Sequence, residues 1–329
     1  VISQKLKTFI SDNDLKQVDF IKIDIEGSEL KLLECFLNNY FKVIQIELIN
    51  YNWMPTVANH CWDASASFYA TAGVSRLHNH PKPMPENIKE NDILFVKTDY
   101  LYDETFQREF LPRIKNKFTL VTGISSYNVQ GKETDILNNE NVKHWFCTNP
   151  PDVNNKKIVP LPIGFEEKER AGGNQGVLNN AMLTAPKWSN KSDKLYLPYH
   201  DVGTNPRRDA QIKLLSSLPY VEVETERLEF AQYLNKMSKY KYILCLSGAG
   251  DDTHRNYEAL LVGSTPVMLS TPLKRVFDVY NLPSVFLREW YDLEKTYKNF
   301  LLKNKYNWDV TDFLNVNTHK ERILSYAKS

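Results

Sequence analysis

The chain of 329 residues carries 41 Lys and Arg against 40 Asp and Glu, for a formal net charge of +1. That balance excludes a strong electrostatic attraction to nucleic acid or to an anionic membrane. The length is sufficient for two or three domains, each with its own hydrophobic core.

The cysteines are far apart in the sequence and form no C-x-x-C pair: Cys35, Cys61, Cys147 and Cys245. This usage excludes a disulfide framework and shows no zinc-binding spacing, so we expect thiols in a reducing compartment. No stretch approaches the roughly 18 apolar residues of a membrane span, and no signal peptide opens the chain. We therefore expect a cytoplasmic location, no integral membrane segment and no nucleic-acid partner.

The first 50 residues predict a strand over Phe20–Ile23, an amphipathic helix over Leu30–Leu37 and a second strand over Phe41–Ile49. The run V-D-F-I-K-I-D-I-E-G-S-E-L resembles a segment of FkbM-type O-methyltransferases. In that family the acidic residues corresponding to Asp24, Glu26 and Glu47 would face the substrate cleft. The simpler alternative is that acidic residues at a strand–helix turn cap the helix.

A methyltransferase of that kind needs a glycine loop for S-adenosylmethionine upstream of Phe20, and residues 1–19 contain no glycine. We therefore expect residues 1–88 to be a partial methyltransferase-like α/β segment without catalysis of its own. Within it, a helix over Asp63–Gly73 and a short strand over Ser75–His78 are predicted. His78 and His80 precede a proline-rich linker, where a surface feature is favoured over a metal site.

From residue 89 onward, strands and helices alternate, which predicts a parallel α/β lobe over residues 89–180. The expected elements are strands over Asp92–Lys97, Phe118–Thr122, Val142–Cys147 and Lys157–Leu161, and a helix over Glu104–Ile114. The alternative that Asp92–Lys97 is the last strand of the N-terminal segment stays open.

Ligands bind beyond the carboxyl ends of parallel strands, so polar residues after these strands are candidate acceptor contacts. They are Lys97, Thr98, Asp99, Thr122, Gly123, Ser125, Ser126, Asn149 and Gly164. A transfer to a hydroxyl needs a carboxylate or an imidazole to take its proton. Asp99 is the first candidate base and His200 the second; the alternative for Asp99 is a solvated loop residue.

Residues 166–192 are polar and glycine-rich, which predicts a long loop or hinge. The second α/β lobe, residues 181–329, then opens with a strand over Lys194–Tyr199 and a helix from Arg207 to Ser217. A strand over Tyr220–Glu224 and a helix over Phe230–Ser238 follow.

Arg207 and Arg208 start a helix, where positive charge is unfavourable for the helix dipole. A bound anion beside them and Asn205 would compensate; the alternative is an ordinary surface helix.

The most informative stretch is a strand over Tyr242–Leu246, a glycine turn with Ser247, Gly248 and Gly250, and a helix ending near Val262. Asp251, Asp252 and Thr253 can each cap that helix, and a further strand covers Val267–Leu269.

Glycines let a phosphate approach the backbone, and a helix N-terminus favours negative charge. Arg255 in the first turn can grip phosphate oxygens, and Glu258 one turn later can accept hydrogen bonds from a ribose. The plain alternative is a solvated Arg–Glu pair on a common αβ unit.

The run D-D-T-H-R-N-Y-E-A-L-L-V-G-S-T-P-V resembles the nucleotide-sugar-binding segment of exostosin-like glycosyltransferases, which have the GT-B fold. Arg255, Glu258, Gly263 and Pro266 match that pattern, whereas the preceding glycine turn departs from it. The resemblance implies that Arg255 contacts the diphosphate and Glu258 the ribose. The segments F-L-P-R-I-K-N-K-F-T-L-V-T-G, H-W-F-C-T-N-P and K-I-V-P-L-P-I-G resemble the acceptor half of such enzymes.

After this unit we expect a helix over Leu273–Tyr280, a strand over Ser284–Leu287, and a helical tail over Leu293–Ser329 that crosses back over the first lobe. The interpretation is a GT-B-like α/β fold with two Rossmann-like lobes and a cleft between them.

The predicted function is transfer of a sugar from a UDP- or GDP-sugar to a glycan hydroxyl. No D-x-D suited to holding Mg²⁺ on a nucleotide-sugar is present, so neither a metal nor another cofactor is expected to be required. The alternatives are an O-methyltransferase fragment and a non-catalytic glycan-binding or scaffold protein.

Overall fold

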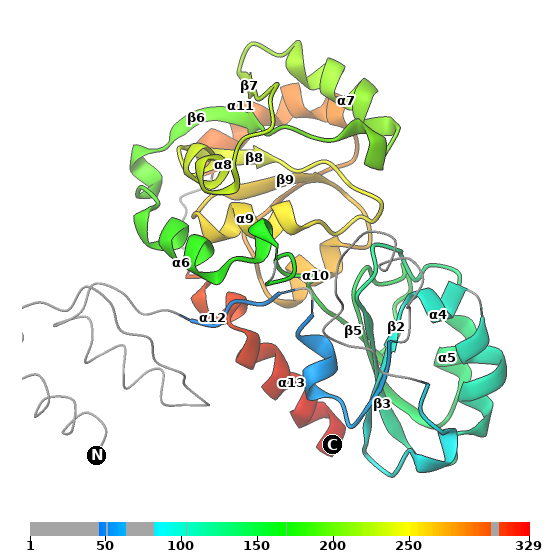
Figure 1. Cartoon of the computed structure of the whole chain (residues 1–329). Coiled ribbons are helices and arrows are strands. Elements are labelled where there is room, and N and C mark those ends of the chain that lie inside the picture. Colours follow the sequence, from blue (N-terminus) through cyan, green and yellow to red (C-terminus); the bar gives the residue numbers. More distant parts are fainter. Residues whose placement is uncertain (1–45, 51, 64–81, 103, 169, 304–308) are drawn as a thin grey trace, which may run out of the picture.

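The computed structural model of the chain describes residues 46–329 apart from 51, 64–81, 103, 169 and 304–308. Two separate five-stranded sheets, each with helices packed around it, form two lobes (Figure 1). All strand pairs within both sheets are parallel. The predicted α/β fold with two Rossmann-like lobes is confirmed.

The sheet of the first lobe follows chain order: β1 (His60–Trp62), β2 (Ile93–Lys97), β3 (Phe118–Gly123), β4 (Val142–Cys147) and β5 (Ile158–Pro160). Every residue of β2 and β3 is buried. Strands covered on both faces read as continuous apolar runs, which is why these strands were predictable. The first strand, β1, lies within the range of the predicted N-terminal segment and pairs with β2.

The helix predicted over Glu104–Ile114 is wrong in type. After α4 (Asp99–Tyr102) the chain forms a π-helical turn, η3 (Phe106–Phe110), and then a 3-10 turn, η4 (Leu111–Arg113). Proline in the first turn of η4 lacks the N–H that would continue an α-helical ladder. The aromatic rings of the π-helical turn are nevertheless fully buried in the core of the lobe. A second short α-helix of this lobe, α5 (Thr134–Asn138), follows β3.

The sheet of the second lobe has the order β10 (Val285–Leu287), β9 (Thr265–Leu269), β8 (Tyr240–Leu244), β6 (Ser192–Leu197) and β7 (Val221–Val223). All five strands were predicted to within two residues at each end. The chain runs outward from β6 to β7 and then returns to the other side of β6 to form β8. The strand order therefore reverses between β6 and β8.

Five helices connect or flank these strands: α7 (Arg207–Ser216), α8 (Phe230–Met237), α9 (His254–Leu261), α10 (Lys274–Val279) and α11 (Leu293–Lys303). Each was predicted, and α9 is buried along most of its length.

The prediction of a long loop over residues 166–192 is wrong, because α6 (Gln175–Thr184) lies within it. The Asn174 side chain caps α6 by accepting a hydrogen bond from the Val177 N–H at 3.1 Å. Leu178 and Asn179 are buried, so packing against the rest of the protein stabilises a helix that its polar sequence did not suggest.

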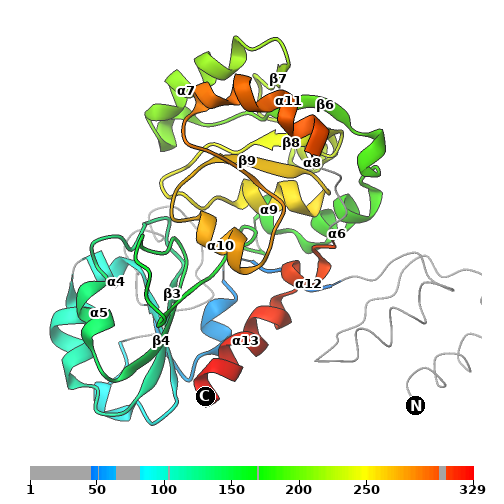
Figure 2. The same ribbon diagram turned by 180° about the vertical axis from the view of Figure 1, so that it is seen from behind.

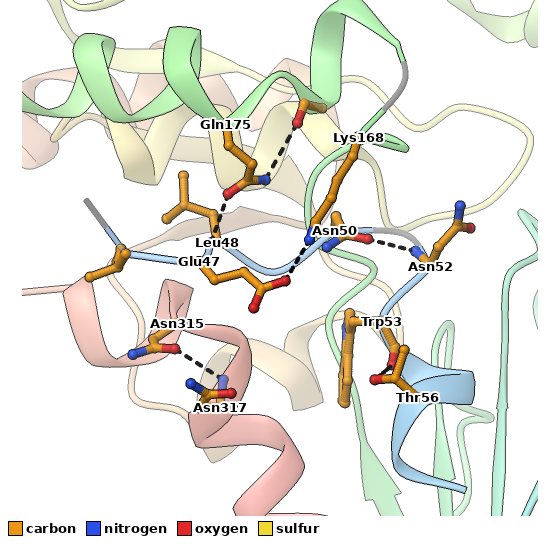
Figure 3. Close-up of polar contacts among 12 residues, drawn as sticks. Glu47, Leu48, Asn50, Asn52, Trp53, Thr56, Lys168, Gln175, Asn315 and Asn317 are labelled. Atoms are coloured by element: carbon orange, nitrogen blue, oxygen red, sulfur yellow. Dashed lines mark hydrogen bonds and ion pairs between the residues drawn. The ribbon is translucent and has the colours of Figure 1, made fainter. Parts of the chain in front are cut away.

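The residues 46–50 pass between α6, the C-terminal helices and the first lobe (Figure 3). Leu48 donates its N–H to Gln175 Oε1 at 2.9 Å, and Glu47 forms an ion pair with Lys168 at 2.5 Å. The described residues 46–49 of the strand predicted over Phe41–Ile49 form an isolated bridge from Leu48 to Asn315, and the adjacent Asn50 forms another to Phe165. These residues therefore link parts of the chain that are distant in sequence.

The C-terminal helix α13 (Val316–Lys328), which follows α12 (Thr311–Leu314), crosses from the second lobe to the first (Figure 2). The Tyr326 ring packs edge-on against His144 at 4.9 Å and Phe146 at 5.4 Å between ring centroids, and both lie on β4. The predicted return of the tail over the first lobe is confirmed. A single apolar cluster consequently runs from the first sheet to α9.

The elements predicted over residues 20–37 and 64–78, with Asp24, Glu26, His78 and His80, lie outside the described residues. Within the part of the chain that the structure describes, no helix has the length and apolarity needed to cross a bilayer.

Candidate functional site

The carboxyl ends of β6 and β8 form the candidate site. Ligands of open parallel sheets bind beyond the carboxyl ends of the strands, where the strand order reverses. His200, 4% exposed, spans this point. Its Nδ1 lies 2.6 Å from the Pro198 carbonyl oxygen after β6, and the Leu246 N–H after β8 donates to its Nε2 at 3.4 Å. The glycine turn that the sequence singled out follows β8 at the same place.

His200 is held by main-chain groups on both ring nitrogens, which assigns the proton to Nδ1. Burial lowers its pKa well below the usual value, and the nearby cations of Arg255 and Arg208 lower it further. The ring is therefore neutral and braces the ends of two strands. Its predicted role as a base stays a prediction, and it would require one of these bonds to open.

The glycine turn is fixed from one side by Arg208 and Asn205 of the β6–α7 connection. Arg208, 7% exposed, donates from Nε to the Ser247 carbonyl at 2.9 Å and from Nη2 to the Leu246 carbonyl at 3.3 Å. Asn205 Nδ2 donates to the Gly248 carbonyl at 3.0 Å. Burial lowers the pKa of Arg208 to about 10, with the charge of Arg255 adding to the effect. In this structure Arg208 and Asn205 support the turn.

Arg207, in contrast, is exposed at the start of α7. Its charge favours the ionised form of Asp251, whose pKa burial raises. The sequence could not say which of the two adjacent arginines points inward, because both are at a helix start without a clear apolar periodicity around them.

The glycine turn also contacts the first lobe. A Cβ atom on Gly250 would lie closer to the Ser126 carbonyl oxygen than real Cβ atoms come, so only glycine fits there. Asn128 Nδ2 donates to Asp251 Oδ2 at 3.3 Å, and the Asp252 N–H donates to Asn149 Oδ1 at 2.8 Å. The turn thus lies where the two lobes meet.

The Asp252 carboxylate is buried at this junction. Its Oδ2 accepts hydrogen bonds from the Ile163 N–H at 3.0 Å and from the Tyr257 hydroxyl at 2.6 Å. The next residue but one, His254, places Nδ1 2.8 Å from the Gly164 carbonyl oxygen. Burial raises the pKa of Asp252 to about 6, although its hydrogen bonds oppose the rise. The side chain braces the lobes here, and a contact of Asp252 with a ligand stays a prediction.

The raised pKa of Asp252 predicts a pH dependence of stability. Between about pH 4 and pH 6 the folded state binds more protons than the unfolded state, so the free energy of unfolding falls as pH rises through this window. A rise from 3.8 to about 6 corresponds to about 3 kcal/mol. Denaturant titrations at pH 4 and pH 7 should show this fall in the free energy of unfolding for the wild type. The fall should be much smaller for Asp252→Asn. Equal losses in both proteins would contradict the assignment.

Arg255 and Glu258, both on α9, are joined through Tyr233 of α8. Arg255 donates from Nε to the Tyr233 hydroxyl at 3.1 Å and from Nη2 to the Tyr199 carbonyl at 2.9 Å. The Tyr233 hydroxyl donates in turn to Glu258 Oε2 at 2.7 Å. Glu258 is 7% exposed, and burial raises its pKa. The guanidinium of Arg255 is therefore partly buried and oriented by polar contacts.

The sequence did not single out Tyr233, Tyr199 or Asn128 as part of this site. Tyr233 lies 22 residues before Arg255 on a different helix, and only the packing of α8 against the sheet brings them together. Thr253, at the cap position of α9, makes a 3.3 Å hydrogen bond to Asn256 and does not cap the helix with its side chain.

Asp99 lies on the other side of the junction, at the start of α4 in the first lobe. Its Oδ1 is 3.6 Å from Nζ of Lys97, a side chain that is 3% exposed. Its Oδ2 has no hydrogen-bond partner among the described residues. The described ion pair joins Asp99 to Lys97 at the end of β2, and no described contact joins it to Arg255 or His200.

Three comparisons with known proteins bear on the chain. The methyltransferase FkbM domain family matches residues 1–61, which confirms the predicted likeness of the N-terminal segment. No curated protein matches the sequence. A chain in a solved structure described as "Crystal structure of GtfA/B complex" matches with a TM-score of 0.33 and 10% sequence identity.

That match covers 73% of this chain and 56% of the other, so this chain spans little more than half of its length. At such a score the likeness says nothing about activity, and the FkbM match covers a small part of the sequence. What the comparisons establish is a methyltransferase FkbM-like segment at residues 1–61, ahead of the site between β6 and β8.

Proposed function

We propose that the protein is a glycosyltransferase that moves a sugar from a UDP- or GDP-sugar to a hydroxyl of a glycan acceptor. The observation that carries the proposal is the position of the glycine turn and the first turn of α9. They follow β8 at the point where the strand order reverses, they contact the first lobe, and Arg255 is oriented beside them.

The chemistry of that position suits a diphosphate. The direction of the N–H groups and the dipole at the start of α9 favour an anion. Arg255 uses Nε and Nη2 in its described contacts, so a phosphate oxygen would be bound through Nη1. Positive potential fixed in advance stabilises the charge that develops on a nucleoside diphosphate as it leaves.

The remaining roles follow from which lobe each residue occupies. Glu258, held by Tyr233, would accept a hydrogen bond from a ribose hydroxyl of the donor. Asp99, on the first lobe, would take the proton of the acceptor hydroxyl, with His200 as the second candidate. Ser247, Gly248, Gly250, Thr253 and Arg207 would line the diphosphate side.

A donor panel tests the proposal. UDP-, GDP- and dTDP-sugars at saturating concentration should raise the unfolding temperature, because a ligand at 100 times its Kd stabilises the folded state by about 2.7 kcal/mol. Calorimetry should then give a Kd for the nucleotide that stabilises most. If no nucleotide or nucleotide-sugar binds, the proposal fails.

Sugar transfer is expected to continue in excess EDTA, because the positive groups at the diphosphate come from the protein. Assays with the best donor from the panel, with and without EDTA, should give rates within about twofold of each other. Loss of transfer in EDTA and its return with Mn²⁺ would show that a metal is required.

A methyltransferase is the second candidate, favoured by the FkbM match at residues 1–61. Calorimetric titration with S-adenosylmethionine separates the two functions: binding of that compound, without binding of any nucleotide, would favour the second.

A further inference from the structure

The loop after β3 in the first lobe carries an exposed aromatic residue next to the glycine turn. The Ser126 carbonyl lies against Gly250, and Asn128 donates to Asp251. Tyr127 stands between these two contacts and is 48% exposed. A large aromatic side chain is thus kept in solvent directly beside the place where the lobes meet.

Tyr127 is paired with Tyr102, which ends α4 and is 41% exposed. The ring centroids are 4.7 Å apart, with an angle of 37° between the planes. The Tyr102 hydroxyl donates to the Asn128 carbonyl at 2.5 Å, and Lys132 Nζ lies 5.6 Å from the centroid of its ring. The Tyr102 ring is therefore held by the hydrogen bond of its hydroxyl and by its contact with Lys132, and it packs against the Tyr127 ring.

We propose that Tyr127, supported by Tyr102, is the surface on which a pyranose ring of the acceptor stacks, an inference that rests on the proposed function. One face of a pyranose carries weakly positive C–H groups, and the face of an aromatic ring is negative. Two exposed tyrosines in contact with each other offer such a face at the edge of the site. The acceptor is placed here because the loop belongs to the lobe opposite Arg255.

The charges around the tyrosine pair suit a neutral ligand. Lys132, whose Nζ lies over the Tyr102 ring, pairs with Glu104 at 3.3 Å, so the nearby charges largely cancel. A neutral, hydroxyl-rich ligand fits this surface better than an anion does.

A nucleobase could also stack on a tyrosine. The donor nucleotide is expected on the other lobe, however, beside Arg255 and Glu258. The geometry therefore points to the acceptor, and stacking of the base is an outcome that the experiment distinguishes.

The test is saturation-transfer difference NMR with the methyl β-glycosides of glucose, galactose, N-acetylglucosamine and xylose, recorded with saturating UDP or GDP. At least one glycoside should show its strongest transfer at the C–H protons of one ring face. Tyr127→Ala should weaken that binding about fivefold to tenfold, whereas Tyr127→Phe should stay within about twofold of the wild type.

A second tyrosine pair serves as the matched control. Tyr297 of α11 stacks on Tyr220 with centroids 4.0 Å apart, at the amino end of β7 and so at the opposite edge of its sheet. Tyr297→Ala should leave glycoside binding unchanged. The same loss in Tyr297→Ala and Tyr127→Ala would overturn the inference.

The other outcomes are equally decisive. If no glycoside binds the wild type while a nucleotide does, or if Tyr127→Ala binds glycosides normally, the inference is wrong and the proposed function stands. If Tyr127→Ala weakens nucleotide binding alone, the ring stacks on a base and the inference is wrong. Failure of the wild type to bind any nucleotide would instead count against the proposed function.

Discussion

Replacing Arg255 by alanine is expected to weaken nucleotide binding by about 10-fold to 150-fold, equivalent to about 1.5–3 kcal/mol for a lost charged hydrogen bond. The guanidinium is partly buried and oriented by Tyr199 and Tyr233, so its removal takes away a charge that is fixed in place. Sugar transfer should fall by at least as much, because the same charge stabilises the leaving diphosphate. Calorimetry with UDP and GDP, together with initial rates of transfer, measures both effects.

Two variants control for this result. Arg255→Lys keeps the charge but loses the planar fork, so it should bind nucleotide with an intermediate affinity. Arg113→Ala removes an exposed arginine whose partner is Glu86 on the outside of the first lobe, and it should bind nucleotide as the wild type does. Full transfer and unchanged nucleotide affinity in Arg255→Ala would exclude the proposed site. If Arg255→Ala binds nucleotide as tightly as the wild type and the wild type itself transfers no sugar, a non-catalytic scaffold is favoured.

Alanine at Gly250 is expected to reduce transfer at least tenfold and to lower the free energy of unfolding by about 1–3 kcal/mol, as overpacking of a well-packed site does. The added Cβ would collide with the Ser126 carbonyl oxygen, and it would also lie 3.1 Å from Asn149 Nδ2. A main-chain oxygen cannot rotate away as a side chain can. The contact between the lobes must therefore shift, and the glycine turn with it.

Gly248 provides the matched control, because it lies in the same turn. A Cβ there would meet Arg208 Nη2 at 3.5 Å, which is ordinary van der Waals contact. Gly248→Ala should keep the unfolding free energy within about 0.5 kcal/mol of the wild type, the usual range where no special feature is disturbed. If Gly248→Ala and Gly250→Ala lose the same transfer rate and the same free energy of unfolding, the close contact of Gly250 with the first lobe does not cause the loss.

Most of the fold could be predicted because parallel strands are covered on both faces. Apolar residues dominate β2, β3 and β8, and most of their residues are buried, so these strands could be recognised from the local sequence. The helix α6 could not be predicted, because its polar residues become buried only when Asn179 meets the main chain of Ile46, 133 residues away. Local sequence carries no trace of a contact at that separation.

At the candidate site, too, some residues could be predicted from local sequence and others could not. The sequence correctly placed Arg255 and Glu258 on one helix behind a glycine turn, since capping residues and glycines are local signals. It could not distinguish Arg208 from Arg207, and it could not find Tyr233. Those assignments depend on which side chains meet across β6, β8 and α8, and this is decided by the assembly of the sheet.

The position of residues 46–50 affects how the protein can be divided. The FkbM match ends at residue 61, which suggests a natural place to separate two modules. Within residues 46–50, however, the Ile49 carbonyl accepts a hydrogen bond from the Phe165 N–H, and the Ile49 N–H donates one to the Leu314 carbonyl. Cleavage at 61 would remove this lining between the lobes together with most of β1. The end of the FkbM match therefore does not coincide with a boundary in the folded structure, and an independently expressed second half should begin before residue 46.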